Sequence, residues 1–135
     1  MRRYVIPGVL AALAALSVLV ATMTSGAATT PTKAVSIAET HCPRNAQFCF
    51  LPATLTVTKG TKVVWKNATF TQHTVTRCTK SACGVSGGTG TDPKLASPLI
   101  NATKTYAFTF QHAGTYVYFC TVHGFVAMHG LVTVK

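Results

Sequence analysis

Acidic residues are almost missing from this chain of 135 residues, which has only Glu39 and Asp92 against 12 Lys and Arg. Apart from Arg2 and Arg3, the positive residues are scattered singly, and no Lys/Arg cluster is present. Nucleic-acid binding needs a concentrated basic surface, so we do not expect it. Removing Arg2 and Arg3 leaves ten Lys and Arg against two acids, a net charge of +8 that favours acidic partners.

Sustained helical periodicity is also missing after the first 28 residues. Short segments rich in β-branched and aromatic residues take its place, separated by turn signals about every ten residues. The clearest segments are residues 55–58, 62–66, 106–110, 115–119 and 130–134. This pattern predicts an all-β fold, an antiparallel sandwich or barrel.

The first residues have the order of a secretory signal peptide. A positive start is followed by an apolar run over residues 4–23 and by small residues at 25–28. We therefore predict a signal peptide over residues 1–28. The alternative is an uncleaved membrane anchor through residues 4–23, whose length approaches the roughly 20 residues that span a bilayer. In both cases the protein is exported and is periplasmic, extracellular or at the cell surface.

The rest of the chain has the length of one domain. Residues 29–41 are rich in Thr and Ala and weakly patterned, which predicts a flexible lead-in. Residues 42–135 are enough for one compact domain with its own core.

Cysteine is present in an odd number, five. In an oxidising compartment four can pair, and one free thiol then needs an explanation. We expect two local disulfides, Cys42 with Cys49 and Cys78 with Cys83, although four cysteines allow three connectivities. The functional alternative for Cys78 and Cys83 is a second metal site. The remaining thiol is Cys120.

Cys120 begins the most informative segment, residues 120–128, which has the spacing C-x2-H-x4-M. His73 supplies a second imidazole from far upstream. Two His and one Cys in a trigonal arrangement, with a weak axial Met, form a blue-copper electron-transfer site. Thiolate and thioether favour Cu(I) while imidazoles accept Cu(II), so neither oxidation state demands a large rearrangement.

The residues around these side chains resemble the cupredoxins. Residues 50–61 and 63–67 are similar to the second and third strands of that family, and residues 73–76 and 114–120 also match it. The resemblance covers residues 48–135 and is to the plastocyanin, pseudoazurin and amicyanin group. The ligand spacing is that of plastocyanin and pseudoazurin, since amicyanin has a shorter ligand loop.

This resemblance implies a Greek-key β-sandwich with one type 1 copper ion per chain. It implies four copper ligands, namely His73, Cys120, His123 and Met128. The two histidines are expected to bind through Nδ1, with the ring edge of His123 at the surface as the electron exit. His41, His112 and His129 are expected to be ordinary residues.

The chain also departs from the family pattern. Thr74 follows the first ligand where relatives often have an Asn that ties the ligand loops together. We expect a hydrogen bond between Thr74 and Thr121 to take over this supporting role. The loop over residues 77–97 is longer than is typical.

Apolar residues surround His123 in the sequence, and we predict that they form a docking surface for a partner. These residues are Pro52, Gly124, Phe125, Val126 and Ala127. Plain loop packing is the alternative interpretation.

Together these features predict a one-electron carrier that cycles between Cu(II) and Cu(I). Its redox protein partners would be exported or membrane-bound, some with acidic docking faces, and the chain itself is expected to be a monomer. Copper sequestration or trafficking needs the same ligands and is the alternative. An enzyme is not expected, because Phe119 and Thr121 flank Cys120 where copper oxidases place a His.

Overall fold

The computed structural model describes residues 26–135. The signal peptide expected over residues 1–28, and the alternative anchor through residues 4–23, therefore lie almost entirely outside the described residues. Among residues 26–135, no helix has the length and apolar character of a membrane span.

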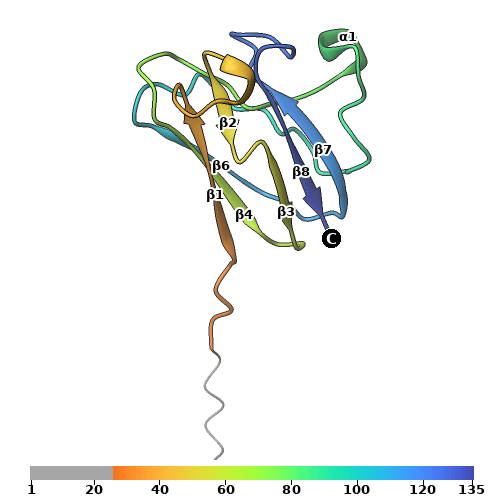
Figure 1. The fold of residues 1–135 in the computed structure, drawn as a ribbon. Coiled ribbons are helices and arrows are strands. Elements are labelled where there is room, and N and C mark those ends of the chain that lie inside the picture. Colours follow the sequence, from red (N-terminus) through yellow and green to blue (C-terminus); the bar gives the residue numbers. More distant parts are fainter. Residues whose placement is uncertain (1–25) are drawn as a thin grey trace, which may run out of the picture.

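Residues 26–135 form eight strands in two four-stranded sheets (Figure 1). The first sheet has the order β2-β1-β4-β6, with β2 at Cys49–Leu51, β1 at Thr32–Ala38, β4 at Lys62–Asn67 and β6 at Thr105–Thr109. The second has the order β3-β8-β7-β5, with β3 at Thr54–Val57, β8 at His129–Val134, β7 at Gly114–Phe119 and β5 at Thr76–Arg77. A 3-10 turn at Pro43–Asn45 and the short α1 at Lys80–Cys83 complete the elements.

The predicted all-β sandwich is confirmed, but its sheets are mixed rather than wholly antiparallel. Strand β1 runs parallel to β4, and β3 runs parallel to β8. Both pairs are far apart in the chain, and such crossovers permit a parallel direction that a tight hairpin does not. The other strand pairs are antiparallel.

The flexible lead-in expected at residues 29–41 is wrong for Thr32–Ala38, which form β1. This strand pairs with β2 on one side and with β4 on the other. Val35 and Ile37 are buried in the core, and Val35 lies opposite Trp65 in the register. Thr32–Ala38 is therefore part of the first sheet.

The core between the two sheets is rich in aromatic side chains. Trp65, Tyr118 and Phe50 are buried, and the Trp65 and Tyr118 rings pack edge to face with their centroids 5.5 Å apart. Phe50 packs on Tyr118 in the same way at 4.8 Å. Such interlocked rings resist displacement, so the sandwich is a rigid frame for the loops at its ends.

The expected disulfides are present: Cys42 pairs with Cys49, and Cys78 pairs with Cys83. A second metal site on Cys78 and Cys83 is therefore ruled out. Cys120 is the free thiol of the described residues, and it is buried.

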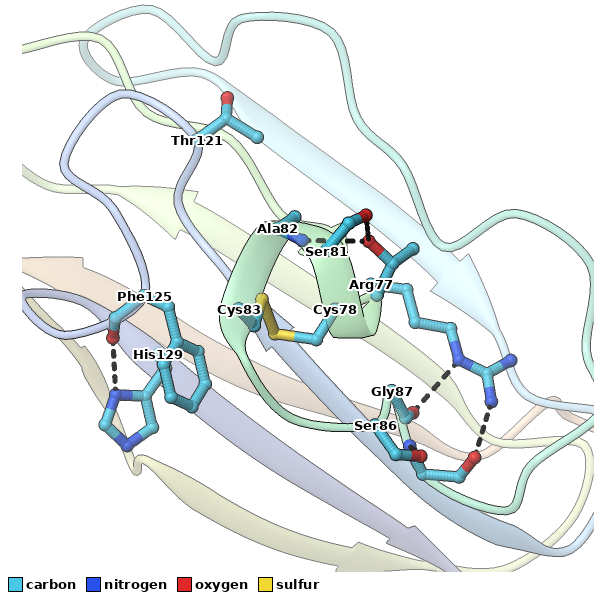
Figure 2. The surroundings of a disulfide bond; sticks show 12 residues. Arg77, Cys78, Ser81, Ala82, Cys83, Ser86, Gly87, Thr121, Phe125 and His129 are labelled. Atoms are coloured by element: carbon cyan, nitrogen blue, oxygen red, sulfur yellow. Dashed lines mark hydrogen bonds between the residues drawn. A yellow bond between two sulfur atoms is a disulfide. The ribbon is translucent and has the colours of Figure 1, made fainter.

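The long segment between β5 and β6 is held by Arg77, which lies beside the Cys78–Cys83 disulfide (Figure 2). The Arg77 guanidinium donates hydrogen bonds to the backbone carbonyls of Gly87, Gly88 and Gly90. Its central carbon also lies 5.0 Å from the centre of the Tyr116 ring. Arg77 thus binds a glycine-rich stretch whose backbone also packs closely against Thr115 and Tyr116.

Asp92 ties the same segment to the turn before β7 and to Tyr116. Its buried carboxylate accepts hydrogen bonds from the backbone N–H of Gln111 and of His112, and from the Tyr116 hydroxyl. The His112 ring approaches it at 2.7 Å. Burial alone would raise the pKa of Asp92, but the bonds from Tyr116, His112 and Gln111 outweigh it and lower the pKa below its ordinary value.

Candidate metal centre

The ligand loop, residues 120–128, connects β7 to β8 at the end of the sandwich opposite the C-terminus (Figure 1). Its own backbone bonds hold its shape. Gly124 N–H donates to Cys120 O at 2.9 Å, and Met128 N–H donates to Gly124 O at 3.0 Å. Cys120 N–H donates to Met128 O at 3.0 Å, which closes the loop. Gly124 has φ +82°, a conformation that favours glycine.

His73 reaches this loop from the segment between β4 and β5. Its backbone forms an antiparallel bridge with Ile100, with N–H to O distances of 3.3 and 2.8 Å in the two directions. The side chain is completely buried, as is that of Cys120, whereas His123 is only partly buried. One imidazole is thus enclosed by protein and the other reaches the surface.

The ligand atoms of His73, Cys120 and His123 all lie within 4.8 Å of one another. The Cys120 Sγ is 3.8 Å from His73 Nδ1 and 3.4 Å from His123 Nδ1. Metal bonds of about 2.0 Å to nitrogen and 2.3 Å to sulfur, opened to trigonal or tetrahedral angles, separate neighbouring ligand atoms by roughly 3.5 Å. The spacing therefore fits a single metal ion bound through both Nδ1 atoms and the thiolate.

Met128, the fourth predicted ligand, is buried in the same region. It is 1% exposed and lines a small cavity of about 160 Å³ together with His123 and Phe48. A soft thioether beside a thiolate and two imidazoles is the donor set that suits copper.

Burial lowers the pKa of His73 to about 4, and the neighbouring His123 adds to this shift. Burial also lowers the pKa of His123. Both rings are therefore neutral at pH 7 and can offer a lone pair to a metal without first losing a proton.

Thr69 determines which nitrogen of His73 has that lone pair. The Thr69 hydroxyl lies 2.9 Å from His73 Nε2 and 2.8 Å from Asn67 Oδ1. The Asn67 oxygen can only accept, so the hydroxyl donates its proton there and accepts from His73 Nε2–H. His73 Nδ1 is left unprotonated and faces the thiol of Cys120.

Asn67 supports Thr69 and is itself fully buried. Its amide nitrogen donates to Thr71 O at 2.8 Å and to Ile100 O at 2.9 Å. Its oxygen accepts from both the N–H and the hydroxyl of Thr69. All donor and acceptor positions of the amide are used, which fixes its orientation. Neither Asn67 nor Thr69 was predicted as part of the site; their polar character and their position shortly before His73 were the available signal.

The hydrogen bond expected between Thr74 and Thr121 is present, with the two hydroxyl oxygens 2.9 Å apart. Thr121 N–H also donates to Thr74 Oγ1 at 2.8 Å. Thr74 N–H lies 3.4 Å from the Cys120 sulfur and points toward it as a donor. Thr74 thus joins the two ligand segments and places a backbone dipole where it stabilises negative charge on sulfur.

Phe48 is a further residue of the site and was not predicted from the sequence. Its ring packs edge-on against His73, with centroids 5.0 Å apart, and lies tilted against His123, with centroids 4.5 Å apart. It is 8% exposed and directly precedes Cys49, whose disulfide fixes this strand end. Phe48 therefore covers both imidazoles on one side.

The other histidines lie outside the cluster, as expected. Within residues 26–135, His73, Cys120 and His123 make the one group of three or more His, Cys, Asp or Glu side chains close enough to share a metal ion. His129 lies with Nδ1 2.8 Å from Phe125 O, and its ring stacks on the Phe125 ring at 4.5 Å (Figure 2).

Comparison with known proteins agrees with this geometry. A family model described as "Copper binding proteins, plastocyanin/azurin family" matches residues 37–135. The chain belongs to this family. It is 35% identical over 91 residues to the plastocyanin of Rumex obtusifolius, an alignment that covers 64% of this chain and 87% of that protein. It is 29% identical over 90 residues to amicyanin-alpha of Methylorubrum extorquens, covering 67% of each.

Solved structures give the same result. A mutant of amicyanin in the Cu(I) form superposes with a TM-score of 0.56 at 30% identity, covering 77% of this chain and 82% of that one. A purple cupredoxin from Nitrosopumilus maritimus superposes with a TM-score of 0.59 at 23% identity, covering 76% of this chain and 98% of that one. The fold is therefore the cupredoxin β-sandwich.

Proposed function

We propose that this chain binds one copper ion through a fixed set of ligands and carries single electrons between exported redox proteins. The ligands are His73, Cys120, His123 and Met128. The observation that carries this proposal is a buried thiol with two imidazole Nδ1 atoms at 3.4 and 3.8 Å, in a chain of a copper-binding family. Bound copper would supply the one-electron couple.

The protein holds these ligands before any metal arrives. Thr69 orients His73, Thr74 joins the two ligand segments, and Phe48 packs against both imidazoles. Ligands fixed in this way need little movement when the charge of the site changes by one. A small rearrangement permits fast electron transfer, which a carrier needs and a storage protein does not.

His123 is the exit for the electron, because it is partly exposed whereas His73 is buried. Exposed apolar side chains occur in the segments that form the site. Of the five large hydrophobic side chains that are exposed in residues 26–135, four belong to segments that hold or adjoin the site. These four are Phe70, Leu99, Val122 and Val126, with Phe70 93% and Val126 94% exposed.

These positions support a docking surface around His123, but its residues differ in part from those predicted from the sequence. The residues proposed from the sequence are Pro52, Gly124, Phe125, Val126 and Ala127. Phe125 is only partly exposed and stacks on His129, so Val126 supplies the main apolar contact of that loop. Val122 adds to the surface within the ligand loop, and Phe70 and Leu99 extend it beyond that loop.

The positive charge of the chain supports partners with acidic docking faces, since opposite charges speed the encounter. Export of the protein agrees with the signal peptide proposed for residues 1–28 and with its two disulfides. We expect the protein to act as a monomer, because electron delivery needs the His123 edge to be free between encounters.

Copper titration combined with voltammetry tests this function. We expect one copper ion per chain and a reversible one-electron wave with fast electrode kinetics. Copper that binds without such a wave would contradict the carrier function and support sequestration, which uses the same four side chains.

A further inference from the structure

A groove of about 400 Å³ opens beside the proposed copper site. It lies between the disulfide-closed segment 42–49 and residues 126–129 at the end of the ligand loop. Its apolar lining includes Ala46, Phe48, Ala53, Val126, Ala127 and Met128. Because Phe48 and Met128 also belong to the site, an apolar group seated here would lie against the shell of the copper ligands.

Arg44 gives the groove a charge. It lines the groove and is exposed, and the residues described contain one salt bridge only, between His112 and Asp92. The Arg44 guanidinium therefore has no carboxylate partner within residues 26–135. An arginine fork matches a carboxylate with two parallel hydrogen bonds, so an unpaired Arg at an apolar groove suits a ligand with both characters.

The segment that carries Arg44 has an unusual backbone. His41, Arg44 and Asn45 have φ values of +61°, +57° and +57°, in the left-handed region that favours glycine. Each such residue costs on the order of 1 kcal/mol, and the Cys42–Cys49 disulfide closes the loop that holds two of them. Strained residues of this kind concentrate at binding sites, where they fix a side chain in one position.

We propose that this groove receives an apolar side chain from an acidic segment of the redox partner, and that Arg44 binds a neighbouring carboxylate of that segment. The proposal rests on the proposed function, because it makes the groove part of the docking surface. Because the chain is positively charged, an acidic partner fits the groove better than a second copy of the chain does. Of its two acidic side chains, Asp92 is buried and hydrogen-bonded, and Glu39 does not line the groove.

A peptide titration followed by NMR tests the proposal on the copper-loaded, reduced protein. The probe is a blocked tetrapeptide of alternating aspartate and leucine, and the comparison probe replaces aspartate with lysine. We expect the acidic peptide to shift the amide signals of Ala46, Phe48 and Ala127 in a saturable way. The basic peptide should leave these signals unchanged.

Variants of Arg44 test whether this side chain binds the carboxylate of the peptide. Arg44→Gln should weaken binding of the acidic peptide about tenfold, the value of a charge-assisted hydrogen bond of roughly 1.4 kcal/mol. Arg44→Lys keeps the charge without the fork and should recover part of the affinity. Lys62→Gln is the matched control, because it removes one exposed positive charge from the first residue of β4, which does not line the groove. It should change the affinity less than twofold.

Three results would overturn the proposal: equal binding of both peptides, an equal loss in Arg44→Gln and Lys62→Gln, or self-association of the chain through the groove in place of peptide binding. The copper absorption is recorded on the same samples. Saturable peptide binding by a protein that takes up no copper would support the groove and reject the proposed function. A copper-loaded protein that does not bind the acidic peptide would reject the groove proposal and leave the proposed function in place.

Discussion

The hydroxyl of Thr69 lies 2.9 Å from Nε2 of His73, and this contact leaves Nδ1 of that ring free to face the Cys120 thiol. The arrangement makes Thr69 a positioning residue, because it acts on the site through His73. Asn67 keeps the hydroxyl in the accepting orientation that this role needs.

Thr69→Val should therefore weaken copper binding by about 10- to 100-fold, the range for loss of a residue that orients a metal ligand. The buried Nε2–H loses its acceptor, which costs about 1–3 kcal/mol and lets the ring change tautomer. A competitive copper titration measures the affinity, and voltammetry measures the reduction potential, which should also shift.

Thr69→Ser is the matched control, since it keeps the hydroxyl and should restore both the affinity and the potential. A Thr69→Val protein with unchanged affinity and potential, but lower resistance to urea, would limit Thr69 to a role in folding.

If the surface around His123 is the docking surface, a charge at Val126 should slow electron transfer. Because this side chain is 94% exposed, Val126→Glu should leave the fold, the copper content and the potential unchanged. Electron self-exchange should slow by about tenfold or more, since a carboxylate would have to be desolvated between two copies of the protein. NMR line broadening in mixtures of oxidised and reduced protein measures this rate.

Val85→Glu is the control, because Val85 is also an exposed apolar residue, 40% exposed, but lies in the segment after α1. It introduces the same charge outside the ligand loop and should change the rate only slightly. Equal slowing in the two variants would mean that net charge, rather than contact beside His123, sets the rate.

Asp92 predicts a dependence of stability on pH. Its pKa is lowered by folding, so its contribution is fully present above the pKa of the unfolded chain and is lost as the pH falls toward the lower, folded value. Asp92→Asn should remove about 2–3 kcal/mol of unfolding free energy at pH 7. The asparagine amide has one acceptor oxygen, so it cannot accept all the hydrogen bonds that the carboxylate receives. Urea unfolding between pH 7 and pH 3 measures both effects.

The acid-induced loss of stability should be shallower in Asp92→Asn than in the wild type. His112→Ala removes only the exposed partner and should cost much less. If Asp92→Asn lost unfolding free energy at low pH as steeply as the wild type, other groups would control that loss.

Met128 should tune the site without being required for copper binding. A long, weak axial ligand contributes little affinity, and leucine has a similar volume, so Met128→Leu should keep the blue colour and raise the reduction potential. Absorption and voltammetry of the purified variant measure these two properties. Failure of Met128→Leu to bind copper would make Met128 a primary ligand, contrary to the geometry proposed here.

The parts of the site that could be predicted from the sequence are those with local spacing. Cys120, His123 and Met128 belong to one loop, and their order alone indicates the chemistry. Asn67 and Thr69 could not be assigned in this way, because their roles depend on bonds to His73 and to Ile100, which strand pairing brings near.

The same limit applies to the fold and to the surface. β1 was missed because only Val35 and Ile37 are apolar and fully buried at alternate positions, and its parallel pairing with β4 is non-local. Phe70 was missed because one aromatic residue in a polar segment is as typical of a core as of a surface. Its 93% exposure follows from the conformation of the loop.

The absorption spectrum of the copper-loaded protein, recorded for the wild type and for Cys120→Ser, tests the central claim most directly. The wild type should show an intense band at roughly 600 nm, from charge transfer between thiolate and Cu(II), which bleaches on reduction. Cys120→Ser should fold and lose the band. A wild-type protein that binds Cu(II) without this band, or a Cys120→Ser protein that keeps it, would contradict the assignment of Cys120 as a copper ligand.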